Sequence, residues 1–173
     1  MRAVSLVLPL AVVVAGCTTT PVQSDRIASG QFIDRTGMAR GTVSLVAEGS
    51  SLTLDASVSG LSPGEHGFHL HTIGECRTPD FTSAEGHLNP ANNQHGPFNA
   101  NGGHLGDLLN ITVGQDGTAE ADYPLNGDRQ LLMQQLFDGD GTAVIIHADA
   151  DDYQTDPAGA AGARVLCAEL KRI

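Results

Sequence analysis

Histidine, a side chain that binds transition metals, is concentrated in two parts of this sequence. The 7 histidines are His66, His69, His71, His87, His95, His104 and His147. All of them lie in or beside residues 72–106 and 148–162, two segments rich in Gly, Pro, Asn and Asp. Such long segments inside a compact domain are usually functional or disordered. Because imidazole is the commonest metal ligand in proteins, the distribution indicates metal binding.

His69 and His71 are two residues apart, a spacing that places both side chains on one face of a strand. Phe68 and Leu70 would then point to the opposite face. Two imidazoles on one face can hold a metal ion together. The pair is a weak signal by itself, because a His-x-His arises readily by chance in a chain with 7 histidines.

A second group combines three histidines with one carboxylate. His87, His95, His104 and Asp107 form a set that suits tetrahedral zinc, and Asp107 supplies one negative charge against the dication. His147 ends the apolar run 143–146. A histidine in that place can be a metal ligand or a packed, hydrogen-bonded residue, and its position alone does not decide between them.

The elements that must position these residues are short strands. Apolar residues alternate with polar ones over 51–58, which predicts a strand with one wet face. Weaker patterns predict strands at 27–33, 41–47, 66–71, 108–113, 118–123, 143–147 and 163–170. Residues 131–137 fit a helical turn or a strand equally well. Short strands in series, separated by turn signals, predict an antiparallel sandwich or barrel.

Length and composition fit one such domain. The chain has 173 residues with 21 glycines, and only 4% of the residues are aromatic, a composition that argues against a helix bundle. The net charge is −11, and no stretch concentrates the basic residues. We therefore expect no nucleic-acid partner and no binding to an anionic membrane surface through basic residues.

The N-terminus has the pattern of an export signal. One positive charge at Arg2 precedes an apolar run over 3–14 that is too short to span a bilayer. The following residues Val14-Ala15-Gly16-Cys17 resemble a bacterial lipobox, which implies cleavage before Cys17 and a lipid on its sulfur. An ordinary secretory signal is the alternative. We thus expect a signal peptide over 1–16, lipidated Cys17 and a tether over 17–25, and a folded domain over 26–173.

The cysteine count fits an exported protein. With Cys17 lipidated, Cys76 and Cys167 remain as a pair, and a disulfide would persist in an oxidising compartment. The alternative is two buried free thiols. The sequence therefore predicts a bridge that links distant parts of the chain.

Six motifs, taken in order, resemble the copper/zinc superoxide dismutases. They are HGFHLH at 66–71, GHLNP at 86–90, HG at 95–96, HLGDL at 104–108, IHA at 146–148 and GARVLC at 162–167. The resemblance covers nearly the whole chain after the export signal. It implies an all-β fold, an eight-stranded antiparallel Greek-key β-barrel with two long functional loops. It also implies copper and zinc ions as cofactors.

The resemblance assigns a role to each candidate residue. It implies copper ligands His69, His71, His87 and His147, and zinc ligands His87, His95, His104 and Asp107, so that His87 is shared. Asp151 matches a carboxylate that hydrogen-bonds a histidine of each site. Arg164 matches the arginine that holds the superoxide anion, and Cys76 and Cys167 match the family's disulfide. His66 has no metal role, and we expect it to pack and hydrogen-bond.

The implied activity is dismutation of superoxide to dioxygen and hydrogen peroxide by alternating reduction and oxidation of a bound copper. Arg164 and His87 would be the catalytic residues, with His87 taking up a proton and returning it to the peroxide. The structural zinc would hold His87 from its other nitrogen. The alternative is a non-enzymatic periplasmic copper/zinc carrier on the same fold. A structural or adhesive β domain would require the histidines to be incidental.

One departure from the family concerns electrostatic steering. Residues 148–163 carry Asp149, Asp151, Asp152 and Asp156 and no basic residue, unlike the lysine-bearing loop of eukaryotic members. Attraction of superoxide would then depend on a local field at the metals and Arg164. We expect a location in the bacterial periplasm, where the lipid on Cys17 is the sole membrane attachment. Thr18 after Cys17 favours the outer membrane, and a homodimer is left open.

Overall fold

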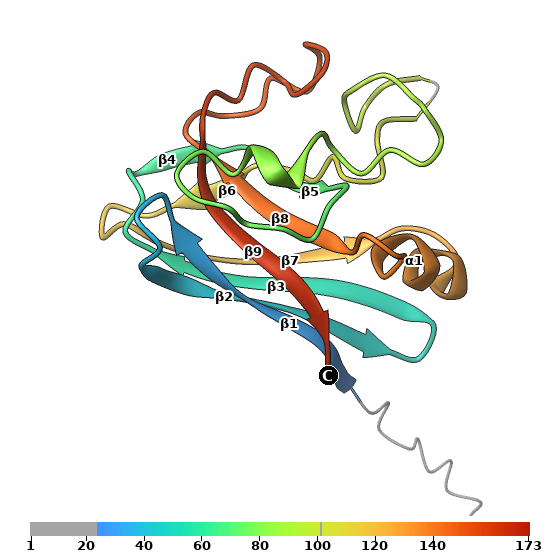
Figure 1. Cartoon of the computed structure of the whole chain (residues 1–173). Coiled ribbons are helices and arrows are strands. Elements are labelled where there is room, and N and C mark those ends of the chain that lie inside the picture. Colours follow the sequence, from blue (N-terminus) through green and yellow to red (C-terminus); the bar gives the residue numbers. More distant parts are fainter. Residues whose placement is uncertain (1–23, 101) are drawn as a thin grey trace, which may run out of the picture.

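The computed structural model describes residues 24–100 and 102–173 (Figure 1). The predicted signal peptide, Cys17 and most of the predicted tether lie outside these residues. Strand β1 begins at Ser24, at the start of the first described range. Among the described residues, no helix is long and apolar enough to cross a membrane.

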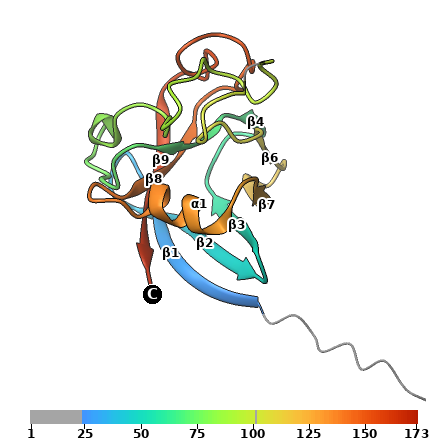
Figure 2. The same cartoon turned by 90° about the vertical axis from the view of Figure 1, so that its right-hand side faces the viewer.

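The described chain forms an antiparallel sheet that curls on itself, with a small second sheet beside it. The large sheet has the strand order β5-β8-β9-β1-β2-β3-β7, and β4 pairs with β6. The strands are β1 Ser24–Asp34, β2 Ala39–Glu48, β3 Ser51–Ser59, β4 Gly64–His66, β5 Phe68–His71, β6 Ile111–Val113, β7 Thr118–Leu125, β8 Thr142–His147 and β9 Arg164–Arg172. Figures 1 and 2 show β1, β2 and β3 as one layer of the curl. The predicted antiparallel β architecture is confirmed.

The strand count differs from the prediction because the segment 66–71 divides at Gly67. His66 pairs with Ile111 in the small sheet, whereas Phe68 pairs with Ile146 in the large one. A Cβ on Gly67 would lie 2.8 Å from the Cβ of Ala161, so there is no room for a larger residue at position 67. The eight predicted strands thus become nine in the described residues. The predicted strand at 108–113 shortens to Ile111–Val113.

The ambiguous segment 131–137 belongs to a short helix, α1 Arg129–Leu136. Asp128 caps its N-terminus, where the side chain accepts a hydrogen bond from the backbone N of Leu131. Leu132 and Leu136 point from the helix into the main core. A 3₁₀ turn, η1 Thr82–Ala84, lies in the first long loop.

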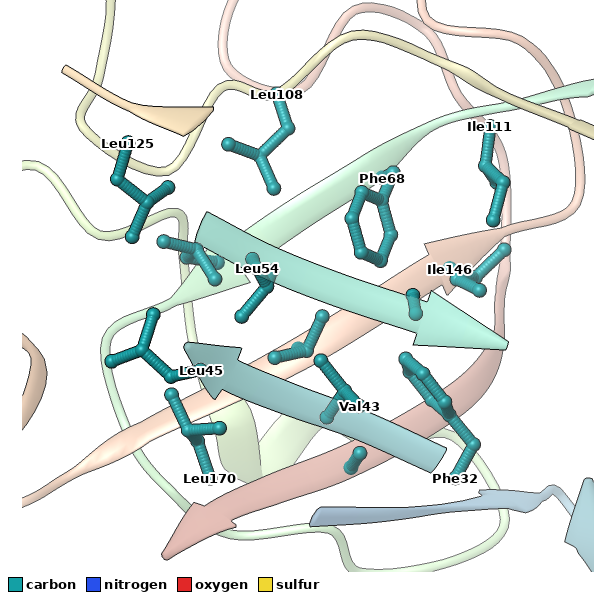
Figure 3. Packing of buried hydrophobic residues seen from close by; sticks show 14 of the residues in the cluster. Phe32, Val43, Leu45, Leu54, Phe68, Leu108, Ile111, Leu125, Ile146 and Leu170 are labelled. Atoms are coloured by element: carbon teal, nitrogen blue, oxygen red, sulfur yellow. The ribbon is translucent and has the colours of Figure 1, made fainter. Parts of the chain in front are cut away.

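The core fills the space between the curled layers. Side chains at every second position are buried in β2 from Val43 onward and in β3 from Leu52 onward, as the alternation over 51–58 predicts for β3. Phe32 from β1 and Phe68 from β5 pack into the same cluster (Figure 3). Burial of each such side chain stabilises the fold by roughly 1.5 to 3 kcal/mol. The barrel is therefore a rigid support for the loops that emerge from it.

Both long loops leave the barrel at the same end. Figures 1 and 2 show the yellow-green part of the first long loop and the orange-red loop over 148–163 at the same end of the barrel. The predicted disulfide between Cys76 and Cys167 is present and joins the first loop to β9, with 5.7 Å between the two Cα atoms. Cys167 is completely buried. The first loop is thus attached covalently to the barrel.

We expect loss of the Cys76–Cys167 bridge to destabilise the metal-free protein strongly. A bridge across 91 residues constrains the unfolded chain, an effect worth roughly 4 to 5 kcal/mol in the loop-entropy model and about 2 to 5 kcal/mol in practice. The double variant Cys76→Ala, Cys167→Ala should lose about 2 to 5 kcal/mol in urea unfolding. Reduction of the unsubstituted protein with a thiol should have a similar effect. A loss below about 1 kcal/mol would contradict this account.

Candidate metal centre

Four histidines from three parts of the chain meet at the loop end of the barrel. His69 and His71 lie on β5, His147 ends β8, and His87 lies in the first long loop. The antiparallel pairing of β5 with β8 brings the strand histidines together. All four side chains are buried, and their ligand atoms lie within 4.8 Å of one another. We call this set the first cluster.

The backbone of the first loop extends β5 and so places His87. Leu88 donates its N–H to the carbonyl of Leu70 at 2.8 Å, and Leu70 donates to the carbonyl of Gly106 at 3.0 Å. A Cβ on Gly106 would lie 2.2 Å from the Leu70 oxygen, so this close approach requires glycine. Two stretches of the loop are therefore fixed against β5 by backbone hydrogen bonds.

Each histidine of the first cluster aims one ring nitrogen at the others. These atoms are Nδ1 of His69 and Nε2 of His71, His87 and His147. They are buried and have no hydrogen-bond partner among the described residues. Unpaired buried nitrogens are costly, and four of them converging on one point fit a transition-metal ion that accepts imidazole ligands. The donor set therefore fits copper.

The opposite ring nitrogens of these histidines are held by hydrogen bonds. His69 Nε2 lies 2.8 Å from Asp151 Oδ2, and His71 Nδ1 lies 2.7 Å from the carbonyl of Glu85. His147 Nδ1 lies 3.2 Å from the carbonyl of Gly162. An N–H donated at each of these contacts leaves the lone pair on the nitrogen that faces the cluster. The surroundings thus select the tautomers that metal binding needs.

A second cluster surrounds Asp107 and shares His87 with the first. The Nδ1 atoms of His87, His95 and His104 lie 2.8, 3.0 and 3.0 Å from Asp107 Oδ1. The other carboxylate oxygen accepts backbone N–H groups from Gly96 at 2.8 Å and His104 at 2.9 Å. Three imidazoles and one carboxylate that converge in this way match the donors of tetrahedral zinc. His87 presents Nε2 to the first cluster and Nδ1 to the second.

The carboxylate of Asp151 contacts one histidine of each cluster. One carboxylate oxygen lies 2.8 Å from His69 Nε2, and the other lies 3.0 Å from His95 Nε2. Burial opposes ionisation of Asp151, but hydrogen bonds from the two histidines and from the Tyr153 backbone outweigh it and lower its pKa to about 2. Asp151 is only 3% exposed, so it is not a solvated acidic residue of the loop surface. The carboxylate is thus ionised and holds one ring of each cluster.

Arg164 lies at the start of β9, beside the first cluster. Its Nη1 donates to the carbonyl of Phe81 at 2.6 Å, and its Nη2 donates to the carbonyl of Glu85. The Glu85 carbonyl also faces His71 Nδ1, so the guanidinium and that ring share one acceptor. Partial burial lowers the pKa of Arg164, and the nearby Asp80 carboxylate opposes this change. Its contacts to neutral carbonyls leave the positive charge without an ion-pair partner among the described residues.

His66 is the histidine that joins neither cluster. Its Nδ1 lies 2.7 Å from the carbonyl of His147, and its Nε2 lies 2.9 Å from the carbonyl of Ser62. Both ring nitrogens are therefore engaged with the backbone. The structure places this residue as predicted, as a packed and hydrogen-bonded side chain.

Other contributors to the site were not identified from the sequence. The carbonyls of Phe81 and Glu85 hold Arg164, and backbone groups leave no residue-type signal. Asn110 contacts Asp151 through both ends of its side-chain amide. It lies next to β6 in a stretch whose side-chain pattern indicates only a strand. Asn110 and Asp151 are 41 residues apart in the sequence, so no local pattern indicates that they meet.

Comparisons with known proteins agree with this geometry. The sequence profile described as copper/zinc superoxide dismutase (SODC) matches residues 39–170. The superoxide dismutase-like protein YojM of Bacillus subtilis (strain 168) is 40% identical over 146 residues, 81% of this chain and 74% of that protein. Cu-Zn superoxide dismutase 2 of Aquifex aeolicus (strain VF5) is 36% identical over 150 residues, 85% of this chain and 88% of that protein.

Solved structures give the same result. A crystal structure of a SOD-like protein from Bacillus subtilis matches with a TM-score of 0.74 and 38% identity, covering 81% of this chain and 95% of that one. The profile match, the relatives and the two histidine clusters lead to one conclusion. The chain belongs to the copper/zinc superoxide dismutase family, an enzyme family whose cofactors are copper and zinc ions.

Proposed function

We propose that the protein converts superoxide into dioxygen and hydrogen peroxide. Two superoxide anions and two protons give one molecule of each product, so one anion is oxidised and the other reduced. His69, His71, His87 and His147 would hold copper, which would supply the one-electron exchange. His87, His95, His104 and Asp107 would hold zinc, which has a single oxidation state. The observation that carries the proposal is the convergence of four imidazole nitrogens that have no hydrogen-bond partner among the described residues, beside a guanidinium that is held by two neutral carbonyls.

Arg164 supplies the attraction for the anion. Its guanidinium is held in place by two carbonyls, keeps its charge and presents a planar set of N–H donors. The chain as a whole carries a charge of −11 and repels an anion at long range. Binding therefore depends on the local field around Arg164 and the metal clusters. The acidic second loop adds no basic residue to that field.

His87 is placed to move a proton. Its Nδ1 faces Asp107 in the second cluster, while its Nε2 faces the first cluster without a hydrogen-bond partner among the described residues. The ring can accept a proton at Nε2 and stay in position, because Nδ1 remains held. A proton carried at Nε2 is then beside the place where peroxide must be protonated to leave.

The imidazoles are in the neutral form that metal binding requires. Burial and neighbouring histidines lower the pKa of His87 from 6.5 to about 4 and that of His147 to about 3. Burial also lowers the pKa of His71 well below its usual value. At neutral pH these rings therefore need not release a proton before they bind a metal ion.

The site of action that we propose is the bacterial periplasm, with the protein attached to the membrane through a lipid on Cys17. Support comes from the lipobox-like residues 14–17 and from the Cys76–Cys167 bridge, because disulfides persist in oxidising compartments. Thr18 after the lipidated cysteine favours the outer membrane.

Dismutase activity should depend on copper. We expect residues 18–173, loaded with copper and zinc, to accelerate superoxide decay by several orders of magnitude over the same protein loaded with zinc alone. Zinc alone supports no one-electron step. Superoxide decay after a pulse gives the rate, and metal content is measured on the same samples. Stoichiometric uptake of both metals without faster decay would contradict the enzyme and favour a copper/zinc carrier.

Replacement of Arg164 should slow the reaction without releasing metal. We expect Arg164→Ala to lower the rate constant by about tenfold or more, because the local positive charge is lost. Arg164→Lys keeps the charge and should lose less. Arg129→Ala is the matched control: it makes the same charge change at a partly exposed arginine whose guanidinium contacts the carbonyl of Gly49. Equal losses in Arg164→Ala and Arg129→Ala would overturn the proposed role.

The metal-free protein should lose stability as the pH falls. The folded pKa of His87 and His147 lies below the unfolded value of 6.5, so the unfolded chain binds more protons below that pH. Each such ring removes up to about 1.4 kcal/mol of stability per pH unit between 6.5 and its own pKa. Urea unfolding at about pH 7.5 and about pH 5 tests this linkage. Equal stability at both pH values is the result that would contradict it.

A further inference from the structure

Asn110, which lies between the second cluster and β6, makes hydrogen bonds through its backbone and its side chain. Its side-chain Nδ2 donates to the carbonyl of Asp151 at 3.0 Å, and its Oδ1 accepts from the Asp151 backbone N at 2.8 Å. The amide thus pairs with residue 151 as a neighbouring strand would. Because this needs a donor and an acceptor in fixed positions, a leucine or a carboxylate could not replace it.

The backbone of Asn110 is held between both tyrosines of the chain. Tyr123 on β7 donates its hydroxyl to the Asn110 carbonyl at 2.8 Å. The Asn110 backbone N donates to the hydroxyl of Tyr153 at 2.8 Å. Burial raises the pKa of Tyr123 to about 12, so that this hydroxyl keeps its proton. Asn110 is therefore fixed to the barrel on one side and to the second long loop on the other.

The carboxylate of Asp151 is confined from the opposite side as well. Its Oδ1 accepts the backbone N of Tyr153 at 2.6 Å. A Cβ on Gly159, where φ is +63°, would lie 1.6 Å from the same oxygen. The second loop thus closes over the carboxylate only because residue 159 has no side chain. With its backbone held by Asn110, Asp151 has little freedom to turn away from its histidines.

We propose that Asn110 is a positioning residue for both metal sites and acts through Asp151. None of its hydrogen bonds goes to a proposed ligand of either cluster. It fixes the backbone of the one residue whose carboxylate holds His69 of the first cluster and His95 of the second. The proposal rests on the proposed metal sites, but it concerns how firmly the metals are held, and it does not require dismutase activity.

The test measures metal retention in the copper- and zinc-loaded protein. We expect Asn110→Ala to speed zinc release into excess chelator about tenfold, because residues that orient metal ligands contribute about 10- to 100-fold to affinity. The copper electron-spin spectrum should change in the same variant, because His69 is no longer oriented. Asn110→Asp retains the acceptor for the Asp151 N–H and loses the donor, so it should release zinc at an intermediate rate.

Two controls separate positioning from general destabilisation. Tyr123→Phe removes a hydrogen bond to the Asn110 carbonyl without touching Asp151. Its zinc release should stay within about twofold of the unsubstituted protein, whatever its melting temperature, because the amide pair with Asp151 remains. In an Asp151→Ala background, Asn110→Ala should produce no further acceleration, since the residue through which it acts is already changed.

Each of these measurements can overturn the proposal. Unchanged zinc release in Asn110→Ala would do so, as would an acceleration by Tyr123→Phe as large as that by Asn110→Ala. Independent effects of Asn110→Ala and Asp151→Ala that multiply in the double variant would show that Asn110 does not act through Asp151. None of these measurements uses superoxide. Failure of this proposal can therefore be distinguished from failure of the dismutase proposal.

Discussion

Four imidazole nitrogens that are buried, face one another and have no hydrogen-bond partner among the described residues set the main constraint on this structure. They are shielded from bulk solvent, and no residue in the described ranges donates a hydrogen bond to them. Such groups are costly to bury, and a bound cation satisfies all of them together. The second ring nitrogen of each of these histidines is held by a carboxylate or a carbonyl, and this contact fixes the orientation of the ring.

Several of the contacts that hold the two long loops in place also hold residues of this cluster or residues beside it. The Cys76–Cys167 bridge attaches the first loop to β9, and the carbonyls of that loop hold Arg164 and His71. The second loop is fixed through Asp151, which contacts one ring of each cluster. Disulfide, arginine and carboxylate therefore stabilise the same arrangement from different sides. The barrel core beneath them contributes rigidity but no ligand apart from those at the ends of β5 and β8.

Charge is distributed unevenly between the molecule and its site. The whole chain carries a charge of −11, and the loop over 148–163 has four aspartates. One of these, Asp151, is buried, and its carboxylate accepts hydrogen bonds from His69 and His95. Beside the first cluster, Arg164 offers a cation that is held by neutral carbonyls. In the proposed reaction an anion is thus attracted by a local feature and not by the overall charge.

Residue identity and order by themselves determined much of this protein. The alternation over 51–58 specified a strand, and the six motifs specified the family, the candidate ligands and the disulfide pair. These inferences succeed because strand periodicity and metal chemistry depend on residue types that can be read directly. The sequence did not reveal the division of 66–71 at Gly67, because pairing in two different sheets leaves the local pattern of side chains unchanged.

Only the tertiary structure decided which groups support the ligands. The carbonyls of Phe81 and Glu85 carry no residue-type signal, and Asn110 meets Asp151 across 41 residues of chain. The structure also settled that 131–137 lies largely in a helix, where a cap at Asp128 and burial of Leu132 and Leu136 in the core select the conformation. The sequence therefore determined the chemistry of the ligands. Folding decided their orientation, because orientation depends on backbone groups and distant contacts that no local pattern encodes.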